Sequence, residues 1–229
     1  MQIPVWRSRL MQGQWFSHLA PELQDSLLAL ARVRRLTPGQ RLFGRGDAPC
    51  GLYAVLEGAV RIGAVSEQGK EALLSLIEPA QWFGEICLFD GQPRTHDAYA
   101  VGPCTLLQIP QAALLVFLDE HPHYWRQLAL LMSHKLRLTF INLEQLTLLP
   151  APARVAQRLL MIADGYGEIE PARRVLQLPQ EQLALLAEAD RSHLGRIERA
   201  ENEIAVLLLK RIAKALNVTA SQLMNDADL

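Results

Sequence analysis

The sequence predicts an α+β protein with an N-terminal β-barrel, one long helix and an all-helical C-terminal domain. Ten of the fourteen glycines lie between Gly39 and Gly102, where they separate short apolar segments. After this block, apolar residues recur at helical spacing and glycine is scarce. Hydrophobic residues make up 50% of the 229 residues, enough for two modest domains with buried cores. We expect the barrel at residues 15–120, the long helix at 121–150 and the helical domain at 151–229.

The glycine-rich block contains the predicted strands. Short apolar segments separated by glycine are typical of strands joined by tight turns, because glycine adopts positive φ freely. Many short strands at close spacing favour a sandwich or a barrel. Upstream, residues 18–36 have a proline near their start and apolar residues at helical spacing, so we expect a helix there. The clearest strand segments are GLYAVLEGAVRIGAV at 51–65, ALLSLI at 72–77 and TLLQIP at 105–110.

A long helical stretch follows from about Gln111 to Leu149. Along it, one row of residues steps by four and three, which is heptad spacing. Two interpretations remain open: the helix packs on its own barrel, or it pairs with a second copy in a dimeric coiled coil. Two prolines in LPAPAR, residues 149–154, end the helix and mark the domain boundary. The row consists of Leu128, Met132, Lys135, Thr139, Asn142, Leu146 and Leu149.

Composition and motifs exclude several classes of protein. No apolar run reaches the ~18 residues of a membrane span. The N-terminus, MQIPVWRSRL, lacks the apolar core of a signal peptide, so we expect a cytoplasmic protein without a membrane partner. The chain has no P-loop, HExxH or Ser-His-Asp spacing signal, so no enzyme, catalytic residue or metal site is predicted. The net charge of −1 indicates no general attraction to nucleic acid.

The three cysteines are odd in number and widely separated. This pattern argues against a disulfide framework and against a cysteine-ligated metal site. We expect them to be buried small apolar side chains, with a redox-sensing role as the alternative. They are Cys50, Cys87 and Cys104.

The segment FGEICLFDGQPRT, residues 83–95, is the candidate ligand site. Arg94 offers a planar set of donors suited to phosphate, and Gly84 allows backbone N–H groups to approach an anion closely. Glu85 could accept hydrogen bonds from ribose hydroxyls, and Thr95 adds a hydroxyl. The segment therefore suits a nucleotide, but a structural ion pair between Glu85 and Arg94 would use the same residues.

The first two thirds of the chain resemble the cyclic-nucleotide-binding domain of the catabolite-activator/FNR (CRP/FNR) superfamily of bacterial transcription regulators. The resemblance covers roughly residues 15 to 165 and includes WFSHL, LTPGQRLFGRGD, GLYAVLEGAVRI and WFGEICLFDGQPRT. It implies a jelly-roll barrel that binds a small effector, possibly a cyclic nucleotide, and a homodimer. In this family the equivalent of Glu85 contacts the ribose and that of Arg94 the cyclic phosphate. The resemblance implies supporting roles for Gly84, Ile86, Thr95 and Thr139.

One position departs from the members that respond to cyclic AMP. Those proteins carry a Thr-Ser pair that reaches the adenine, whereas this chain has Thr139-Phe140. The resemblance therefore does not fix the base of the effector.

The C-terminal segment predicts a DNA-binding helix-turn-helix. PQEQLALLAEA followed by DRSHLGRIERA is typical of two helices joined by a short turn, with Asp190 capping the second. Polar and basic residues near the start of that second helix suit the major groove, where arginine reads guanine. Gln180, at the start of the first helix, could contact a phosphate. The predicted DNA-binding residues of this second helix are Arg191, Ser192, Arg196 and Arg199.

Residues 178–224 resemble the lambda-repressor/Cro-like (XRE) helix-turn-helix family. The resemblance rests on DRSHLGRIE and LLKRIAKALNV, and no glycine that could begin a β-wing follows Gly195. It implies a DNA-binding domain without a β-wing, in contrast to the winged helix of catabolite-activator relatives. We therefore expect a homodimeric transcription regulator that binds a palindromic operator in double-stranded DNA, with RNA polymerase as a candidate partner. The alternative is a ligand-binding or protein-interaction module without sequence-specific DNA binding.

Overall fold

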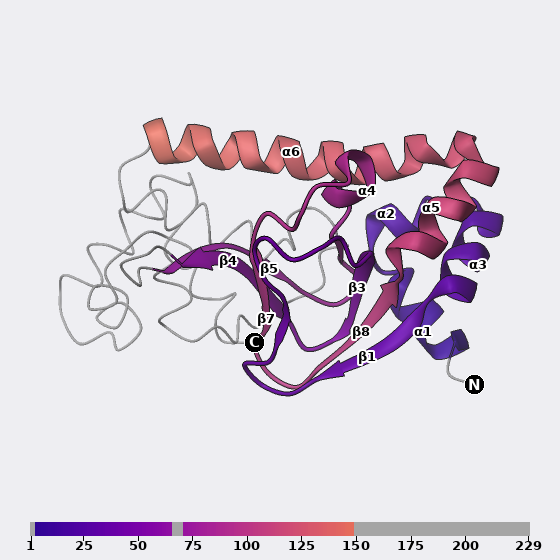
Figure 1. Cartoon of the computed structure of the whole chain (residues 1–229), viewed down its shortest axis with the longest axis horizontal. Coiled ribbons are helices and arrows are strands. Elements are labelled where there is room, and N and C mark those ends of the chain that lie inside the picture. Colours follow the sequence, from indigo (N-terminus) through magenta and orange to yellow (C-terminus); the bar gives the residue numbers. More distant parts are fainter. Residues whose placement is uncertain (1–2, 66–70, 149–229) are drawn as a thin grey trace, which may run out of the picture.

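The structure, a computed structural model, describes residues 3–65 and 71–148. Within these ranges two β-sheets are covered at one side by short helices, while a long helix lies across the barrel (Figure 1). The helices are α1 (Ile3–Leu10), α2 (Gln14–Ser17), α3 (Pro21–Leu30), α4 (Ile86–Asp90), α5 (Gln111–Glu120), the 3₁₀ turn η1 (Pro122–Tyr124) and α6 (Trp125–Leu148).

The two sheets each contain four strands, and every observed pairing is antiparallel. One sheet has the order β1-β8-β3-β6 and the other β2-β7-β4-β5. This double-sheet arrangement is that of a jelly roll, and it confirms the predicted α+β class. The strands are β1 (Arg32–Leu36), β2 (Arg41–Phe43), β3 (Leu52–Glu57), β4 (Val60–Val65), β5 (Glu71–Ile77), β6 (Trp82–Phe83), β7 (Asp97–Ala100) and β8 (Cys104–Ile109).

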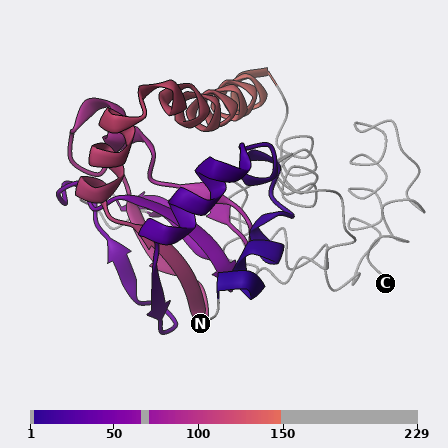
Figure 2. The same ribbon diagram turned by 90° about the vertical axis from the view of Figure 1, so that its right-hand side faces the viewer.

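Strand β3 is buried on both faces and separates two hydrophobic cores. Tyr53 and Val55 belong to the core that includes residues of both sheets. Leu52 and Leu56 point the other way, into a core shared with helices α1, α2, α3, α5 and α6. Figure 2 shows these helices beside the barrel. Strand side chains alternate between faces, so an apolar run without polar interruptions is what a strand between two cores requires.

The predicted tight turn between β3 and β4 is confirmed. Gly58 has φ +75°, and a Cβ there would lie 2.3 Å from the carbonyl oxygen of Pro103. A side chain is therefore excluded by backbone conformation and by space. The segments predicted as strands at 51–65, 72–77 and 105–110 form β3 and β4, β5 and β8.

The helix expected over residues 18–36 was wrong in its second half. Helix α3 ends at Leu30, and Arg32–Leu36 form strand β1, which pairs with β8 from Arg32↔Gln108 to Leu36↔Cys104. Arginine favours helices, but here the pairing with a distant strand decides the conformation. Strands β2, β6 and β7 were not predicted, because two to four residues carry too little periodicity to be recognised.

The predicted long helical stretch is divided at His121 and Pro122 into α5 and α6. Of the predicted row, Leu128 is buried in the helix-side core. Lys135, Thr139 and Asn142 line a cavity against the barrel. This supports the first of the two interpretations for that row: it packs on its own barrel.

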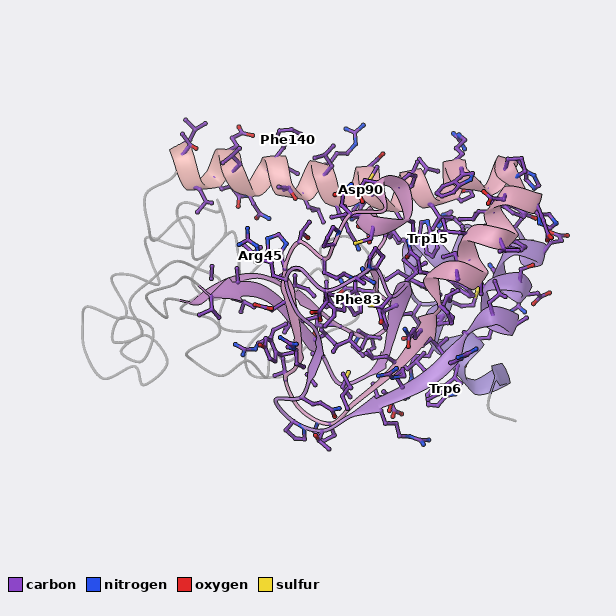
Figure 3. The ribbon with its side chains drawn as sticks, viewed as in Figure 1. Trp6, Trp15, Arg45, Phe83, Asp90 and Phe140 are labelled. Carbon is purple, nitrogen blue, oxygen red and sulfur yellow. The ribbon has the colours of Figure 1, made fainter. Side chains whose placement is uncertain are left out.

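A different row of α6 is apolar and exposed. Leu136, Phe140 and Leu143 step by four and three, and each is more than half exposed. Phe140 lies on the side of α6 away from the barrel (Figure 3). This row has coiled-coil spacing and is exposed on the surface of α6, so it offers a second candidate seam beside the one predicted from the sequence.

Within the described ranges, no helix is long and apolar enough to cross a membrane. The three cysteines are free thiols there, with Cys87 and Cys104 buried and Cys50 half-buried.

Candidate functional site

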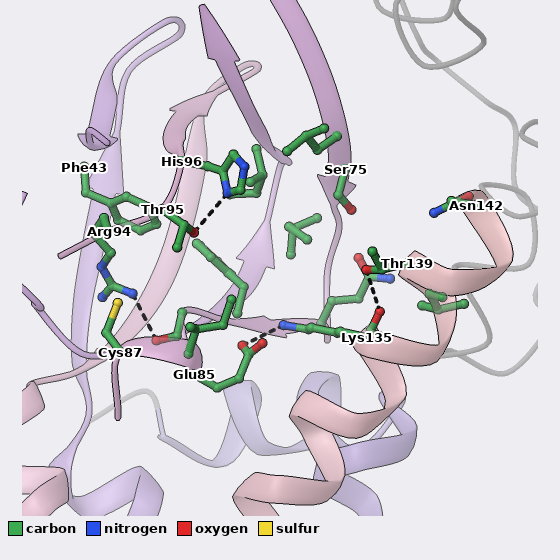
Figure 4. A pocket seen from close by; sticks show the side chains of 18 residues that line it. Phe43, Ser75, Glu85, Cys87, Arg94, Thr95, His96, Lys135, Thr139 and Asn142 are labelled. Atoms are coloured by element: carbon green, nitrogen blue, oxygen red, sulfur yellow. Dashed lines mark hydrogen bonds and ion pairs between the residues drawn. The ribbon is translucent and has the colours of Figure 1, made fainter. Parts of the chain in front are cut away.

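A cavity of about 250 Å³ lies between the barrel and α6. One wall is the segment from Phe83 to His96, and the opposite wall is formed by Lys135, Leu138, Thr139 and Asn142 (Figure 4). The volume is close to that of a small organic ligand, and the lining combines apolar side chains with a few charged ones. All six residues predicted for the effector site line this cavity: Gly84, Glu85, Ile86, Arg94, Thr95 and Thr139.

Gly84 sets the path of the chain at the cavity wall. It follows β6 with φ +94°, and a Cβ there would lie 2.9 Å from Arg94 Nη1 and 2.9 Å from the carbonyl oxygen of Gly51. The missing side chain is therefore what allows the Arg94 guanidinium to lie against the backbone. The segment 83–95 also contains α4, whose C-cap residue Gly91 has the left-handed conformation with φ +63°.

Arg94 is a buried cation held by neutral acceptors. Its side chain reaches into the fold with 4% of the residue exposed. Nη1 donates to Gly84 O at 3.0 Å, and Nη2 donates to Gly51 O at 2.5 Å and to Cys50 Sγ at 3.2 Å. The guanidinium also lies 4.5 Å from the centre of the Phe43 ring. These contacts fix the orientation of the group without neutralising it.

Among the described residues, Arg94 has no carboxylate partner, and its buried Nε has no hydrogen-bond acceptor. A buried charge is costly unless it is paired and hydrogen-bonded. The positive charge of Arg94 is therefore not compensated by any described carboxylate. Arg94 borders the cavity, so an anion bound there would compensate it.

Glu85 is paired with α6 and not with Arg94. Its Oε2 lies 2.8 Å from Lys135 Nζ, which also donates to Trp82 O at 2.5 Å. Only 3% of Glu85 is exposed. The structural ion pair between Glu85 and Arg94 that the sequence left open is not formed. Sequence reasoning placed Lys135 on the helix row but missed its role, because its partner lies fifty residues away in the chain.

The remaining predicted residues surround the cavity with less definite contacts. Thr139 Oγ1 donates to Lys135 O at 2.9 Å, as threonine often does within a helix. Thr95 Oγ1 lies 2.9 Å from Nδ1 of His96, a lining residue that was not predicted. Ile86 is 42% exposed and contributes apolar surface at the start of α4.

Burial raises the pKa of two thiols and of one phenol in the described part of the chain. Burial raises the pKa of the Cys87 thiol, and the nearby guanidinium opposes this only in part. Burial alone raises the pKa of Cys104 to about 11. Burial, with the hydrogen bond to Cys50, raises the pKa of the Tyr53 phenol. Cys87 and Cys104 are therefore neutral thiols near pH 7, as expected for small apolar side chains.

The residues predicted to contact DNA lie outside the described ranges. They are Gln180, Arg191, Ser192, Arg196 and Arg199.

Comparison with protein families gives two matches. Residues 33–121 match the cyclic nucleotide-binding domain, and residues 172–223 match a helix-turn-helix. A Mycobacterium tuberculosis protein named CRP-like cAMP-activated global transcriptional regulator is 33% identical over 160 residues, which cover 69% of this chain and 71% of that protein. The Thermus thermophilus cyclic AMP receptor protein is 32% identical over 201 residues, covering 87% and 90% respectively.

The chain belongs to the CRP/FNR family. It is a DNA-binding transcription regulator with a cyclic-nucleotide-binding-like domain followed by a helix-turn-helix, as the sequence predicted. Its relatives are regulators and not enzymes, and they favour this function over an interaction module without sequence-specific DNA binding.

Solved structures agree with the fold of this CRP/FNR protein. The Thermus thermophilus catabolite activator protein aligns with a TM-score of 0.51 and 30% identity, covering 88% of this chain and 99% of that one. A Silicibacter pomeroyi protein described as a putative cAMP-binding regulatory protein aligns with a TM-score of 0.62 and 22% identity, covering 86% and 88%.

Proposed function

We propose that this regulator is a cytoplasmic homodimer whose binding to a palindromic operator is controlled by a cyclic mononucleotide in the cavity between the barrel and α6. The observation that carries this proposal is Arg94, a buried cation with an unpartnered Nε at the cavity wall. Of the anions that could meet it, a nucleotide also uses the carboxylate of Glu85. The named ligands of the two relatives make cyclic AMP the first compound to test.

The charge of the cavity favours a ligand with one negative charge. Among its lining residues the formal charges are those of Arg94, Lys135 and Glu85, which sum to one positive charge. A cyclic mononucleotide carries one negative charge on its phosphodiester, whereas an open-chain monophosphate carries nearly two at pH 7 and a cyclic dinucleotide carries two. Charge complementarity supports the cyclic mononucleotide.

Glu85 provides a physical route from the ligand to α6. A ribose hydroxyl that donates to the Glu85 carboxylate would compete with Lys135 for this acceptor, or share it with Lys135. Any change in this contact acts on α6, which precedes the helix-turn-helix segment at residues 172–223 in the sequence. A ligand shifts a conformational equilibrium only by its differential affinity for the two states, and this shared carboxylate is where such a difference can arise.

The exposed apolar row on α6 supports the homodimer. Leu136, Phe140 and Leu143 have the spacing of a coiled-coil face and are all exposed, and Phe140 points away from the barrel. Two helices packed along this row would form a two-fold symmetric interface. Such a dimer presents two helix-turn-helix segments to two half-sites, which explains the expected palindrome.

Within the proposal, each part of the chain has a separate task. Residues 15–120 form the effector domain, residues 121–150 the dimerisation helix and residues 151–229 the DNA-binding domain. Arg191, Ser192, Arg196 and Arg199 read base edges, Gln180 contacts a phosphate, and RNA polymerase is the partner through which bound protein affects transcription.

Calorimetric titration of the full-length protein with a panel of nucleotides tests the ligand. We expect one cyclic mononucleotide to bind per chain, with cyclic dinucleotides and open-chain monophosphates at least about tenfold weaker. Arg94→Lys keeps the charge but loses the planar group, so affinity should fall by about 10-fold or more. Arg45→Lys, an exposed arginine outside the cavity, is the matched control. If no nucleotide binds, or if Arg94→Lys binds as well as the unchanged protein, the proposal fails.

A further inference from the structure

His96 lies in the cavity but takes no part in the contacts described above for Arg94 and Glu85. It is half-buried, immediately precedes β7 and lines the same cavity as Arg94. Its Nδ1 lies 2.9 Å from Thr95 Oγ1, and Figure 4 shows the ring at the cavity wall beside Thr95. The imidazole therefore borders the same cavity as the buried Arg94 cation, with Thr95 between the two residues in the chain.

Several charged groups lie close to His96. Arg45 and Asp97 act on it with opposite signs, and the backbone N–H of Arg45 donates to Asp97 Oδ1 at 2.9 Å. The same cavity is also lined by the cation of Arg94 and by the Lys135–Glu85 pair, which is neutral as a unit. The nearby Cys87 is a neutral thiol, because burial raises its pKa.

These surroundings keep His96 uncharged when the cavity holds no ligand. Burial lowers the pKa of His96 below its ordinary value of 6.5, Arg45 lowers it further, and Asp97 opposes them. The ring is therefore neutral near pH 7. An anion beside Thr95 would reverse this balance, since an opposite charge at close range favours the protonated ring.

We propose that His96 is a further anion-binding residue of the cavity, which contacts the ligand phosphate together with Arg94 and Thr95 and binds it most tightly when the imidazole is protonated. The inference rests on the proposed function. It adds a second, titratable cation to the phosphate site, so that ligand affinity depends on pH.

The direction of this dependence follows from linkage. In the free protein the pKa of His96 is below 6.5, and with an anion bound it must be higher. Binding then takes up a proton, so affinity increases as the pH falls from neutral through the free-state pKa. Above the bound-state pKa the ring stays neutral in both states, and affinity no longer depends on pH. The phosphodiester itself stays ionised throughout this range and adds no pH dependence of its own.

A purely structural role would give a different result. If His96 only orients the Thr95 hydroxyl, a glutamine that keeps a hydrogen-bonding group would preserve both the affinity and its response to pH. His96→Gln separates the two roles because it keeps a polar side chain but cannot carry a charge. His123→Gln is the matched control, since His123 is an exposed histidine on η1, outside the cavity.

The experiment is calorimetric titration with cyclic AMP and cyclic GMP between about pH 5.5 and about pH 8, in two buffers of different ionisation enthalpy. For the unchanged protein and for His123→Gln we expect affinity to be about 3- to 10-fold higher at the acidic end, with net proton uptake on binding. His96→Gln should bind at every pH about as the unchanged protein does at the alkaline end, with no proton uptake.

Two contrary results are distinguishable. If the unchanged protein binds a cyclic mononucleotide with an affinity that does not change with pH, or if His96→Gln keeps the full pH dependence, the role of His96 is overturned while the proposed function stands. If no cyclic mononucleotide binds at any pH, the proposed function is overturned and the inference with it.

Discussion

Lys135 on α6 and Glu85 at the start of α4 form an ion pair with Nζ and Oε2 2.8 Å apart. Because Lys135 also donates to Trp82 O, one side chain joins the long helix to two points of the barrel. The Glu85 side chain is almost fully buried and that of Lys135 largely so. This contact holds α6 against the barrel and lies at the wall of the cavity.

Lys135→Met should destabilise the protein by about 1–3 kcal/mol, because it leaves the Glu85 carboxylate buried without its cation. Partial exposure of Lys135 keeps the cost below that of a fully buried pair. Denaturant unfolding of the full-length protein measures the loss. The double variant Glu85→Gln, Lys135→Met removes the stranded charge and should recover most of the stability. If the double variant is no more stable than Lys135→Met, the pair does not act as inferred.

Gly84→Ala should reduce both stability and ligand affinity. The new Cβ would need φ +94° and would lie 2.9 Å from both Arg94 Nη1 and Gly51 O. We expect a loss of about 1–3 kcal/mol in stability, with Arg94 displaced from its acceptors. Thermal unfolding and nucleotide titration measure the two effects.

Gly91→Ala is the control for this substitution. Gly91 also has positive φ, +63°, but a Cβ there would meet nothing within 4 Å. It should cost about 1–2 kcal/mol in stability, from the backbone conformation alone, and leave ligand affinity unchanged. Equal losses of ligand affinity in the two variants would show that backbone strain, and not the position of Arg94, is responsible.

Replacing Phe140 and Leu143 together with serine should convert the dimer to a monomer. Both residues lie on the exposed apolar row of α6, and neither belongs to a hydrophobic core. Their replacement therefore removes the proposed interface and leaves both cores intact. Analytical ultracentrifugation measures the oligomeric state. Val116→Ser changes an exposed apolar residue on α5 and should remain dimeric. A dimer that survives the double substitution would place the interface elsewhere.

Much of the fold was predictable, because the signals were local. The glycines at the turns and the continuous apolar run of β3 are visible in the sequence, and they predicted β3, β4, β5 and β8 correctly. The error at Arg32–Leu36 has the opposite cause: its strand conformation depends on pairing with β8, about seventy residues later. Local periodicity in the sequence carries no information about a pairing strand so far away.

In the candidate site, too, the residues close together in the sequence were predicted and those that depend on the fold were missed. Gly84, Glu85, Arg94 and Thr95 lie within twelve residues, and their chemistry alone suggested an anion site. Lys135 and His96 were missed because lysine and histidine are usually exposed or satisfied side chains. Only the fold shows that one pairs with Glu85 and the other borders the cavity.

The most direct measurement is the affinity of the full-length protein for a DNA fragment that it selects from a random pool, with and without cyclic mononucleotide. Fluorescence anisotropy at fixed salt should show that the ligand changes the affinity of the unchanged protein about tenfold or more. Arg94→Lys should bind the same fragment without responding to that ligand concentration, and Arg191→Ala with Arg196→Ala should lose the fragment while remaining dimeric. An equal response from the unchanged protein and Arg94→Lys, or no response from either, would contradict control of DNA binding through this cavity.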